Sequence, residues 1–251
     1  MSATTVGQVH RTLRRALNDA VRCGLIQSNP ASGARLPKAS APRLLDVWTP
    51  AQTTLFLQAT GNDRLGVLWS VALHTGLRRG ELAGLRWRDI DLESGKVSVL
   101  VQRTTVDYRV VSIEPKAGSR RVVQLADDVL TEVRAHHRRQ AGERAAAGLL
   151  GAGPDDVVFA DESGVPYHPQ RIRVLFAKAC KHAAVPVITL HGLRHAMVTA
   201  ALQAGIHPKI VQERLGHSTI AMKLDTYSHV TDTVQSTAAE TLHHHMTRPH
   251  H

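Results

Sequence analysis

Apolar residues recur at three- and four-residue spacings between residues 6 and 24, and this periodicity predicts one amphipathic helix. The helix is expected to end at Gly24. The segment that follows, from Asn29-Pro30 through Pro37 to Pro42, is rich in proline and small polar residues, so we interpret it as a linker. The polar face of the predicted helix carries Arg11, Arg14, Arg15 and Arg22.

A second folded unit is predicted to begin at Thr49. The run Thr49-Pro50-Ala51-Gln52 has an N-cap residue, a first-turn proline and a capping-box glutamine in the order that a helix start requires. We expect helices over residues 50–60, 63–75 and 79–85, with a turn at Gly76.

The pattern changes from helical to extended between residues 96 and 125. Segments rich in valine and isoleucine alternate there with turn-forming residues, which favours a three-stranded antiparallel sheet with Lys116 in its last hairpin. The fold class is therefore α+β and mainly α. We expect strands over 96–101, 109–113 and 121–125, and later helices over 127–147, 168–184, 191–204, 208–215 and 231–242.

Basic residues outnumber acidic ones by 31 to 21, which gives a formal net charge of +10. Residues 1–45 hold seven Arg and Lys against the single acid Asp19. A basic surface attracts phosphates and releases their counterions, so we expect a nucleic-acid partner, although a solvated basic face gives the same count. No stretch approaches the roughly 20 apolar residues of a membrane span, and the N-terminus lacks the apolar core of a signal peptide. We expect a soluble, cytoplasmic, nucleoid-associated protein without a membrane partner.

Four short segments carry the residues that suggest a chemical activity. They are Thr75 to Leu82 (TGLRRGEL), Pro115 to Arg121 (PKAGSRR), Leu190 to His195 (LHGLRH), and Leu215 to Ser218 (LGHS) with Asp225 to His229 (DTYSH) after it.

The chain from about Thr49 to Val230 resembles the tyrosine recombinase, or phage integrase, family. That family has an arginine followed three residues later by an acid, then a hairpin lysine, His-x-Leu-Arg-His, Leu-Gly-His and a tyrosine. Every element occurs here in this order, and the ordered set rather than any single motif carries the resemblance. The helix over residues 6–24 resembles the last helix of the family's core-binding domain.

The resemblance implies transesterification of a DNA phosphodiester with no metal ion, ATP or other cofactor. Arg78 and Arg194 would bind the non-bridging oxygens, because guanidinium groups are permanently charged and make forked hydrogen bonds to phosphate. Tyr227 would be the nucleophile that forms a 3′-phosphotyrosyl bond and leaves a free 5′ hydroxyl.

The remaining expected roles concern proton transfer and support. The resemblance implies that Lys116 protonates the departing 5′ oxygen, that His191 accepts the tyrosine proton and that His217 hydrogen-bonds the phosphate. Glu81, His195 and His229 are expected to support the site, and Arg11, Arg14, Arg15, Arg22 and Arg120 to bind DNA.

Each of these residues also has an ordinary structural interpretation when it is taken alone. Arg78 and Glu81 have the spacing of a common surface ion pair on a helix, and a hairpin lysine such as Lys116 is usually solvated. His191 and His195 have the spacing of metal ligands, but the glutamate of the zinc-binding HExxH motif is absent, so we expect no metal site.

We interpret residues 1–45 as a remnant of a helical core-binding domain plus linker, 46–242 as the catalytic domain and 243–251 as a His-rich tail without assigned function. One helix cannot bury its own apolar stripe, so residues 6–24 must pack on the catalytic domain or on a partner. A shortened chain, a misassigned start and a degenerate prophage remnant stay open as origins. Ala117 stands where the family commonly has threonine.

The expected function is site-specific recombination that integrates or excises a mobile element at attachment sites in double-stranded DNA. The resemblance also implies that four protomers assemble on two DNA sites, with Val234–Leu242 as a helix that docks on a neighbour. Two alternatives stay open: a DNA-binding remnant without catalysis, and a type IB topoisomerase that relaxes DNA as a monomer.

Overall fold

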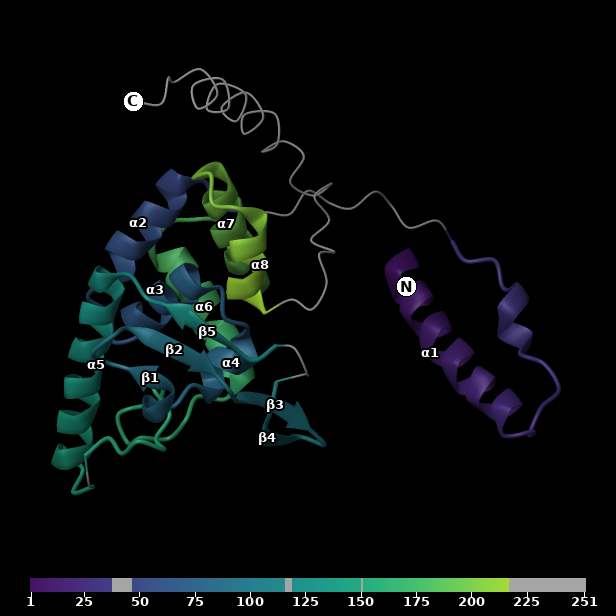
Figure 1. Cartoon of the computed structure of the whole chain (residues 1–251), viewed down its shortest axis with the longest axis horizontal. Helices are drawn as coiled ribbons and strands as arrows, with labels where there is room; N and C mark the ends of the chain where they lie inside the picture. Colours follow the sequence, from purple (N-terminus) through teal and green to yellow (C-terminus); the bar gives the residue numbers. More distant parts are fainter. Residues whose placement is uncertain (38–46, 116–118, 150, 217–251) are drawn as a thin grey trace, which may run out of the picture. The chain divides into compact units, whose positions relative to one another are not determined.

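The chain divides into two units, Met1–Leu45 and Asp46–His251 (Figure 1). The computed structural model describes residues 1–37, 47–115, 119–149 and 151–216. The predicted helix over 231–242 and the His-rich tail therefore lie outside the described residues. No helix within the described ranges is long and apolar enough to cross a lipid bilayer.

The first unit consists of one long helix, α1 (Ala3–Arg22), and a short 3-10 helix, η1 (Pro30–Gly33). The periodicity of the apolar residues predicted this long helix, and the prediction is confirmed; Gly24 follows it with a left-handed φ of 71°. The segment expected to be an irregular linker begins instead by folding back on α1, because the side chain of Asn29 donates a hydrogen bond to the Arg14 carbonyl at 2.9 Å.

The second unit is built around α3 (Gly66–Thr75), which is buried along almost its whole length and contacts α2, α5 and α7. Four aromatic rings, those of Trp48, Phe56, Trp69 and Phe176, pack with centroid separations between 4.7 and 6.5 Å. Each helix lies within a few residues of its predicted bounds. Besides α3, they are α2 (Pro50–Thr60), α4 (Arg79–Gly84), α5 (Asp127–Ala146), α6 (Pro169–His182), α7 (Leu190–Gln203) and α8 (Pro208–Leu215). The short 3-10 helix η2 (Trp87–Asp89) was not predicted.

The strands form two sheets rather than the single predicted one. β2 (Lys96–Val99) pairs antiparallel with β1 (Ile90–Asp91) and with β5 (Arg121–Gln124). β3 (Gln102–Val106) and β4 (Arg109–Ile113) form a separate antiparallel pair. A three-stranded antiparallel sheet is therefore present, but the prediction that 109–113 is its third strand was wrong, because β1 takes that place.

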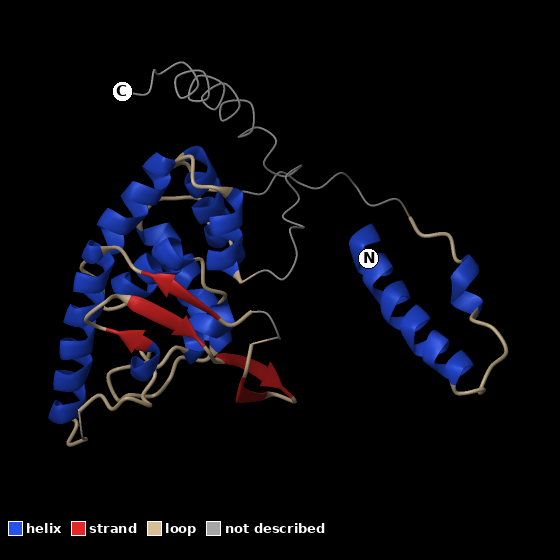
Figure 2. Cartoon of the chain, in the orientation of Figure 1, coloured by secondary structure: helices blue, strands red, loops and turns tan. Residues whose placement is uncertain are grey.

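The turn between β3 and β4 explains this difference. Its two residues, Asp107 and Tyr108, both have positive φ, 45° and 63°, which is the geometry of a two-residue turn that joins immediately adjacent strands. Val106 and Arg109 accordingly pair across it. The hairpin extends away from the larger sheet (Figure 2), and Tyr108 at its tip is fully exposed.

Two glycines of α4 let the backbone of β3 lie directly against that helix. A Cβ atom at Gly80 would lie 2.9 Å from the carbonyl oxygen of Arg103, and a Cβ at Gly84 would lie 3.1 Å from the Arg103 nitrogen. Any larger residue at these positions would push the strand outward. The glycines therefore fix the position of Arg103 beside the start of α4.

Replacing Gly80 with alanine is expected to destabilise the protein, whereas Gly142→Ala on α5 is expected to stabilise it. Alanine is preferred over glycine inside a helix by about 0.5–1 kcal/mol. The Cβ position of Gly142 has no neighbour within 4 Å, so the full preference is gained there, whereas at Gly80 the clash with β3 outweighs it. Unfolding in denaturant measures both variants, and an equal gain in stability from the two changes would contradict the close packing of β3 on α4.

Candidate functional site

Arg78 lies where one helix ends and the next begins. Gly76 ends α3 with a left-handed φ of 62°, and Arg78 is the N-cap residue of α4. The side chain of Glu81, in the first turn of α4, reaches back and accepts the backbone N–H of Arg78 at 2.8 Å. The local helix start therefore fixes the backbone of Arg78 and brings Glu81 beside it.

The carboxylate of Glu81 is shared by two arginines. Its side chain is only 1% exposed, and its Oε1 accepts a hydrogen bond from Arg78 Nη1 at 2.8 Å. Arg121 forms a two-point contact with the same carboxylate, at 2.8 Å to Oε2 and 3.1 Å to Oε1. Burial alone would raise the pKa of Glu81, but the hydrogen bonds and charge of Arg121, together with the hydrogen bonds of Arg78, lower it below its usual value. Glu81 is therefore ionised.

Arg121 was not among the predicted site residues. Besides its contact with Glu81, its Nε donates to the carbonyl of Arg214 near the end of α8, at 2.6 Å. It thereby connects β5, α4 and α8. The available signal was the alternation along β5, which places Arg121 on the same face as the buried Val123.

Arg194 anchors α7 through main-chain carbonyls. The residue is 3% exposed, and its guanidinium donates to the carbonyl of Gly76 and, at 2.7 Å, to the carbonyl of Leu215. These acceptors lie at the ends of α3 and α8. The arginine is thus held at the meeting point of three helices.

His191 is the second residue of α7, whose start is capped by the Thr189 hydroxyl. Its ring packs edge-on against that of His195, with centroids 4.5 Å apart. Partial burial, followed by the positive charges of Arg194 and Arg78, lowers the pKa of His191. The neutral imidazole is therefore favoured, and a neutral imidazole can accept a proton.

Arg78, His191 and Arg194 line one pocket of about 670 Å³, which we call the arginine pocket. β3 and the start of α6 complete its wall, and no described lining residue is acidic. Fixed guanidinium groups without a facing carboxylate suit the oxygens of a phosphate. The cationic and titratable residues of the pocket are Arg78, Arg79, Arg103, Arg173, His191 and Arg194.

Of the other predicted site residues, Glu81 contacts Arg78 and His195 contacts His191, whereas no other joins this group within the described part of the chain. Arg120 is exposed and pairs with Glu114 at 2.5 Å. Lys116, His217, Tyr227 and His229 lie outside the described residues. The basic residues of α1, which belong to the other unit, are all exposed; they are Arg11, Arg14, Arg15 and Arg22.

No group of three or more His, Cys, Asp or Glu side chains within the described ranges could hold a metal ion. His191 and His195 thus have no third ligand of this kind among those residues.

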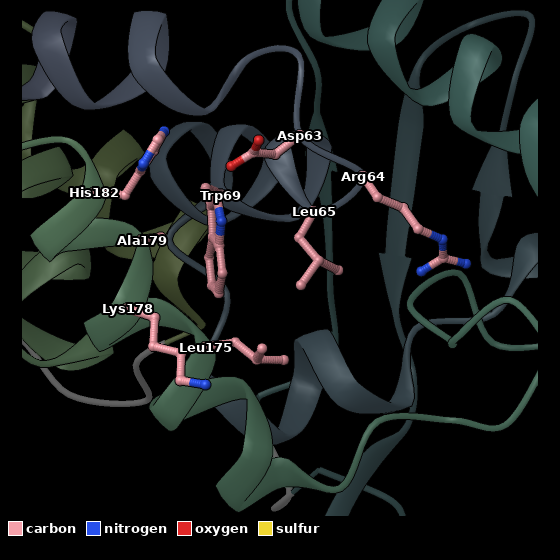
Figure 3. Close-up of a pocket in the computed structure, with 8 residues that line it drawn as sticks. All are labelled: Asp63, Arg64, Leu65, Trp69, Leu175, Lys178, Ala179 and His182. Carbon is pink, nitrogen blue, oxygen red and sulfur yellow. The ribbon is translucent and has the colours of Figure 1, made fainter.

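A second hollow of about 340 Å³ lies between the start of α3 and α6 (Figure 3). Its floor is apolar, with Leu65, Trp69 and Leu175, and its rim mixes the acidic Asp63 with the basic Lys178. No predicted site residue lines it. Because this hollow mixes charges and is lined by no residue of the four motifs, the arginine pocket is the candidate site.

Removing the Glu81 carboxylate is expected to be strongly destabilising. Glu81→Ala leaves two guanidinium groups without their shared acceptor, and breaking a buried ion pair costs about 3–5 kcal/mol. The exposed Glu132 on α5 serves as a matched control, since Glu132→Ala is expected to change the unfolding free energy by less than about 0.5 kcal/mol. Denaturant titration of both variants provides the measurement.

The cost of Glu81→Ala is also expected to depend on pH. Because the pKa of Glu81 is lowered in the folded protein, the stabilisation is present above the unfolded pKa of about 4.3 and is lost as pH falls through the folded value. The difference between wild type and variant should therefore shrink in acid. A difference that stays constant there would show that the charge on Glu81 is not what stabilises the network.

Comparisons with known proteins place this chain in a family. The sequence profile of the phage integrase family matches residues 39–233. The XerC-like tyrosine recombinase of Caldanaerobacter subterraneus subsp. tengcongensis is 29% identical over 258 residues, covering 96% of this chain and 66% of that protein. The ICEBs1 integrase of Bacillus subtilis is 26% identical over 246 residues, with the same two coverages. The chain thus spans slightly less than two thirds of these relatives.

The solved structures give the same result. The integrase of transposon Tn1549, determined in complex with transposon right end DNA, superposes with a TM-score of 0.78 at 26% sequence identity, over 96% of this chain and 80% of that one. The described second unit therefore has the tyrosine-recombinase fold. Because the family profile covers well over half of the sequence and includes all of the described second unit, this chain belongs to the phage integrase family.

Proposed function

We propose that this chain is the catalytic part of a tyrosine-type site-specific DNA recombinase, which integrates or excises a mobile element. The observation that carries the proposal is the arginine pocket, where Arg78, His191 and Arg194 come together from distant parts of the sequence and no described lining residue is acidic. Membership of the phage integrase family supports the same reaction.

In the proposed reaction the scissile phosphate binds in the arginine pocket. Arg78 and Arg194 hold its two non-bridging oxygens and offset the negative charge that develops as phosphorus becomes pentacoordinate. The oxygen of Tyr227 attacks phosphorus, the bond to the 5′ oxygen breaks, and a 3′-phosphotyrosyl bond forms. That bond conserves the energy needed for rejoining, so strand exchange requires no ATP.

Two proton transfers accompany the proposed attack. Neutral His191 accepts the proton of Tyr227, and Lys116 donates a proton to the departing 5′ oxygen. His217 adds a hydrogen bond to the phosphate. Glu81 keeps Arg78 in place through its buried ion pair, and His195 supports the ring of His191. We assign His229 a supporting role on the family motif alone.

The proposed partner is double-stranded DNA with specific attachment sites. The Tn1549 integrase was solved with transposon DNA, which supports a DNA partner for this chain. We assign residues 1–45 to the remaining part of a core-binding domain, whose exposed basic face would contact the backbone through Arg11, Arg14, Arg15 and Arg22. We further propose that four protomers join two sites in the cytoplasm, with Val234–Leu242 docking on a neighbour.

Covalent trapping tests the proposed nucleophile. On a pool of nicked duplexes with randomised cores, the wild-type chain is expected to form a protein–DNA adduct that survives denaturation, and Tyr227→Phe is expected to form none. Tyr108→Phe is the matched control, because Tyr108 is the fully exposed phenol at the hairpin tip and its loss should leave the adduct yield unchanged.

Other outcomes of the trapping experiment favour the alternatives. DNA binding without any adduct would support a DNA-binding protein that lacks catalysis. An adduct accompanied by relaxation of a supercoiled plasmid, with no strand exchange, would support a type IB topoisomerase.

The pH dependence of adduct formation tests the role of His191. The pKa of His191 is lowered, so the base stays neutral to a lower pH than an ordinary histidine, and the acidic limb of the rate should have its midpoint below about 6.5. His191→Gln should remove this limb and lower the rate, whereas His182→Gln, on the exposed surface of α6, should retain both. Persistence of the limb in His191→Gln would assign it to another group.

A further inference from the structure

Arg103 is a cation of the arginine pocket that no sequence motif identified. It is the second residue of β3, and this strand contacts both α4 and α6. The close approach of the β3 backbone to Gly80 and Gly84 places it beside the N-cap of α4, where Arg78 lies. Arg103 therefore enters the pocket from a wall different from those of Arg78 and Arg194.

The guanidinium of Arg103 is incompletely bonded. Its Nη1 is buried and has no hydrogen-bond partner, which within the described ranges is true of no other buried side-chain nitrogen or oxygen. By contrast, Arg78 is bonded to Glu81, and Arg194 is bonded to the carbonyls of Gly76 and Leu215. Burial lowers the pKa of Arg103, because removal from water disfavours the charged form. A buried donor without a partner costs free energy, which a ligand with an acceptor oxygen would offset.

We propose that Arg103 binds a DNA backbone phosphate next to the scissile one, and so helps to hold the strand in the arginine pocket. The inference rests on the proposed function, in which Arg78 and Arg194 occupy the two non-bridging oxygens of the scissile phosphate. Among the other arginines of this pocket of about 670 Å³, Arg103 has the buried Nη1 without a partner, and it is then available for the neighbouring phosphate of the same strand. Arg103 is accordingly a DNA-binding residue rather than a catalytic one.

Arg103 is expected to destabilise the free protein and to stabilise its complex with DNA, so substitution of Arg103 tests the inference. Arg103→Met keeps a long side chain but removes the charge and the donors. If Arg103 binds DNA, the variant should unfold at the same temperature as wild type or higher, because the buried unpaired charge is gone. Its affinity for a fluorescein-labelled random-sequence duplex should fall about 10-fold, the loss expected for one hydrogen bond to a charged group.

The salt dependence of DNA binding and a matched control variant test whether Arg103 itself contacts a phosphate. The slope of log affinity against log salt concentration should decrease by about 0.9 in Arg103→Met, which corresponds to one lost phosphate contact. Arg138→Gln removes the same charge from the exposed face of α5 and should leave affinity and slope unchanged.

Arg103→Lys should recover part of the DNA affinity that Arg103→Met loses. At saturating DNA, the rate of adduct formation by Arg103→Met should stay within about 3-fold of wild type, a difference smaller than one hydrogen bond.

The possible failures are distinguishable. If wild type and Arg103→Met bind DNA equally, the inference about Arg103 is wrong and the proposed recombinase activity is untouched. A lower unfolding temperature with unchanged DNA affinity would make Arg103 a structural residue. If Arg103→Met binds normally at saturation but cleaves far more slowly, Arg103 acts on the scissile phosphate itself, which also overturns the inference. Absence of any adduct from wild type, with normal DNA binding, would instead count against the proposed function.

Discussion

The candidate site depends on one buried carboxylate. Glu81 is almost inaccessible to solvent, and it binds Arg78 from its own helix and Arg121 from β5. Because one negative charge is shared by two permanent positive charges, the cluster keeps an excess of positive charge after every hydrogen bond is counted. The two ion pairs therefore hold α4 and β5 together. They also leave Arg78, whose side chain is 37% exposed, able to attract an anion from the pocket side.

The hydrogen bonds of Arg121 also reach α8, the last helix within the described residues. Its bond to the Arg214 carbonyl links the Glu81 cluster to α8, immediately before the Leu215-Gly216-His217 motif. The helix that carries Arg78 and the helix that leads to His217 are therefore held by the same arginine. Short motifs that are far apart in the sequence can in this way share one structural support.

Local signals made the helices predictable. The Thr49 capping box forms as expected, with the hydroxyl and the Gln52 side chain each bonded to the other residue's backbone N–H. The sheet was harder because β1 has only two residues and β3 is polar, so neither has the apolar alternation that marks a strand. Without β3, the segment 109–113 was assigned to the wrong sheet.

The candidate site was predictable where an ordered motif carried it. Arg78, His191 and Arg194 do meet at one pocket, whereas the roles of Lys116, His217, Tyr227 and His229 stay predictions. Arg103 could not be found in this way, because its place depends on contacts between β3 and glycines some 20 residues earlier, which no local pattern encodes.

The way in which Arg194 is anchored bears on how such a site can evolve. Both of its described acceptors are peptide carbonyls, at Gly76 and Leu215, and every amino acid supplies that group. Sequence drift at Leu215 can therefore alter the side chain without removing the acceptor, provided that the path of the chain is kept. Gly76 cannot be replaced as freely, since its left-handed φ disfavours other residues. Natural selection on the anchor thus acts on the course of the backbone more than on the identity of the residues that contact the arginine.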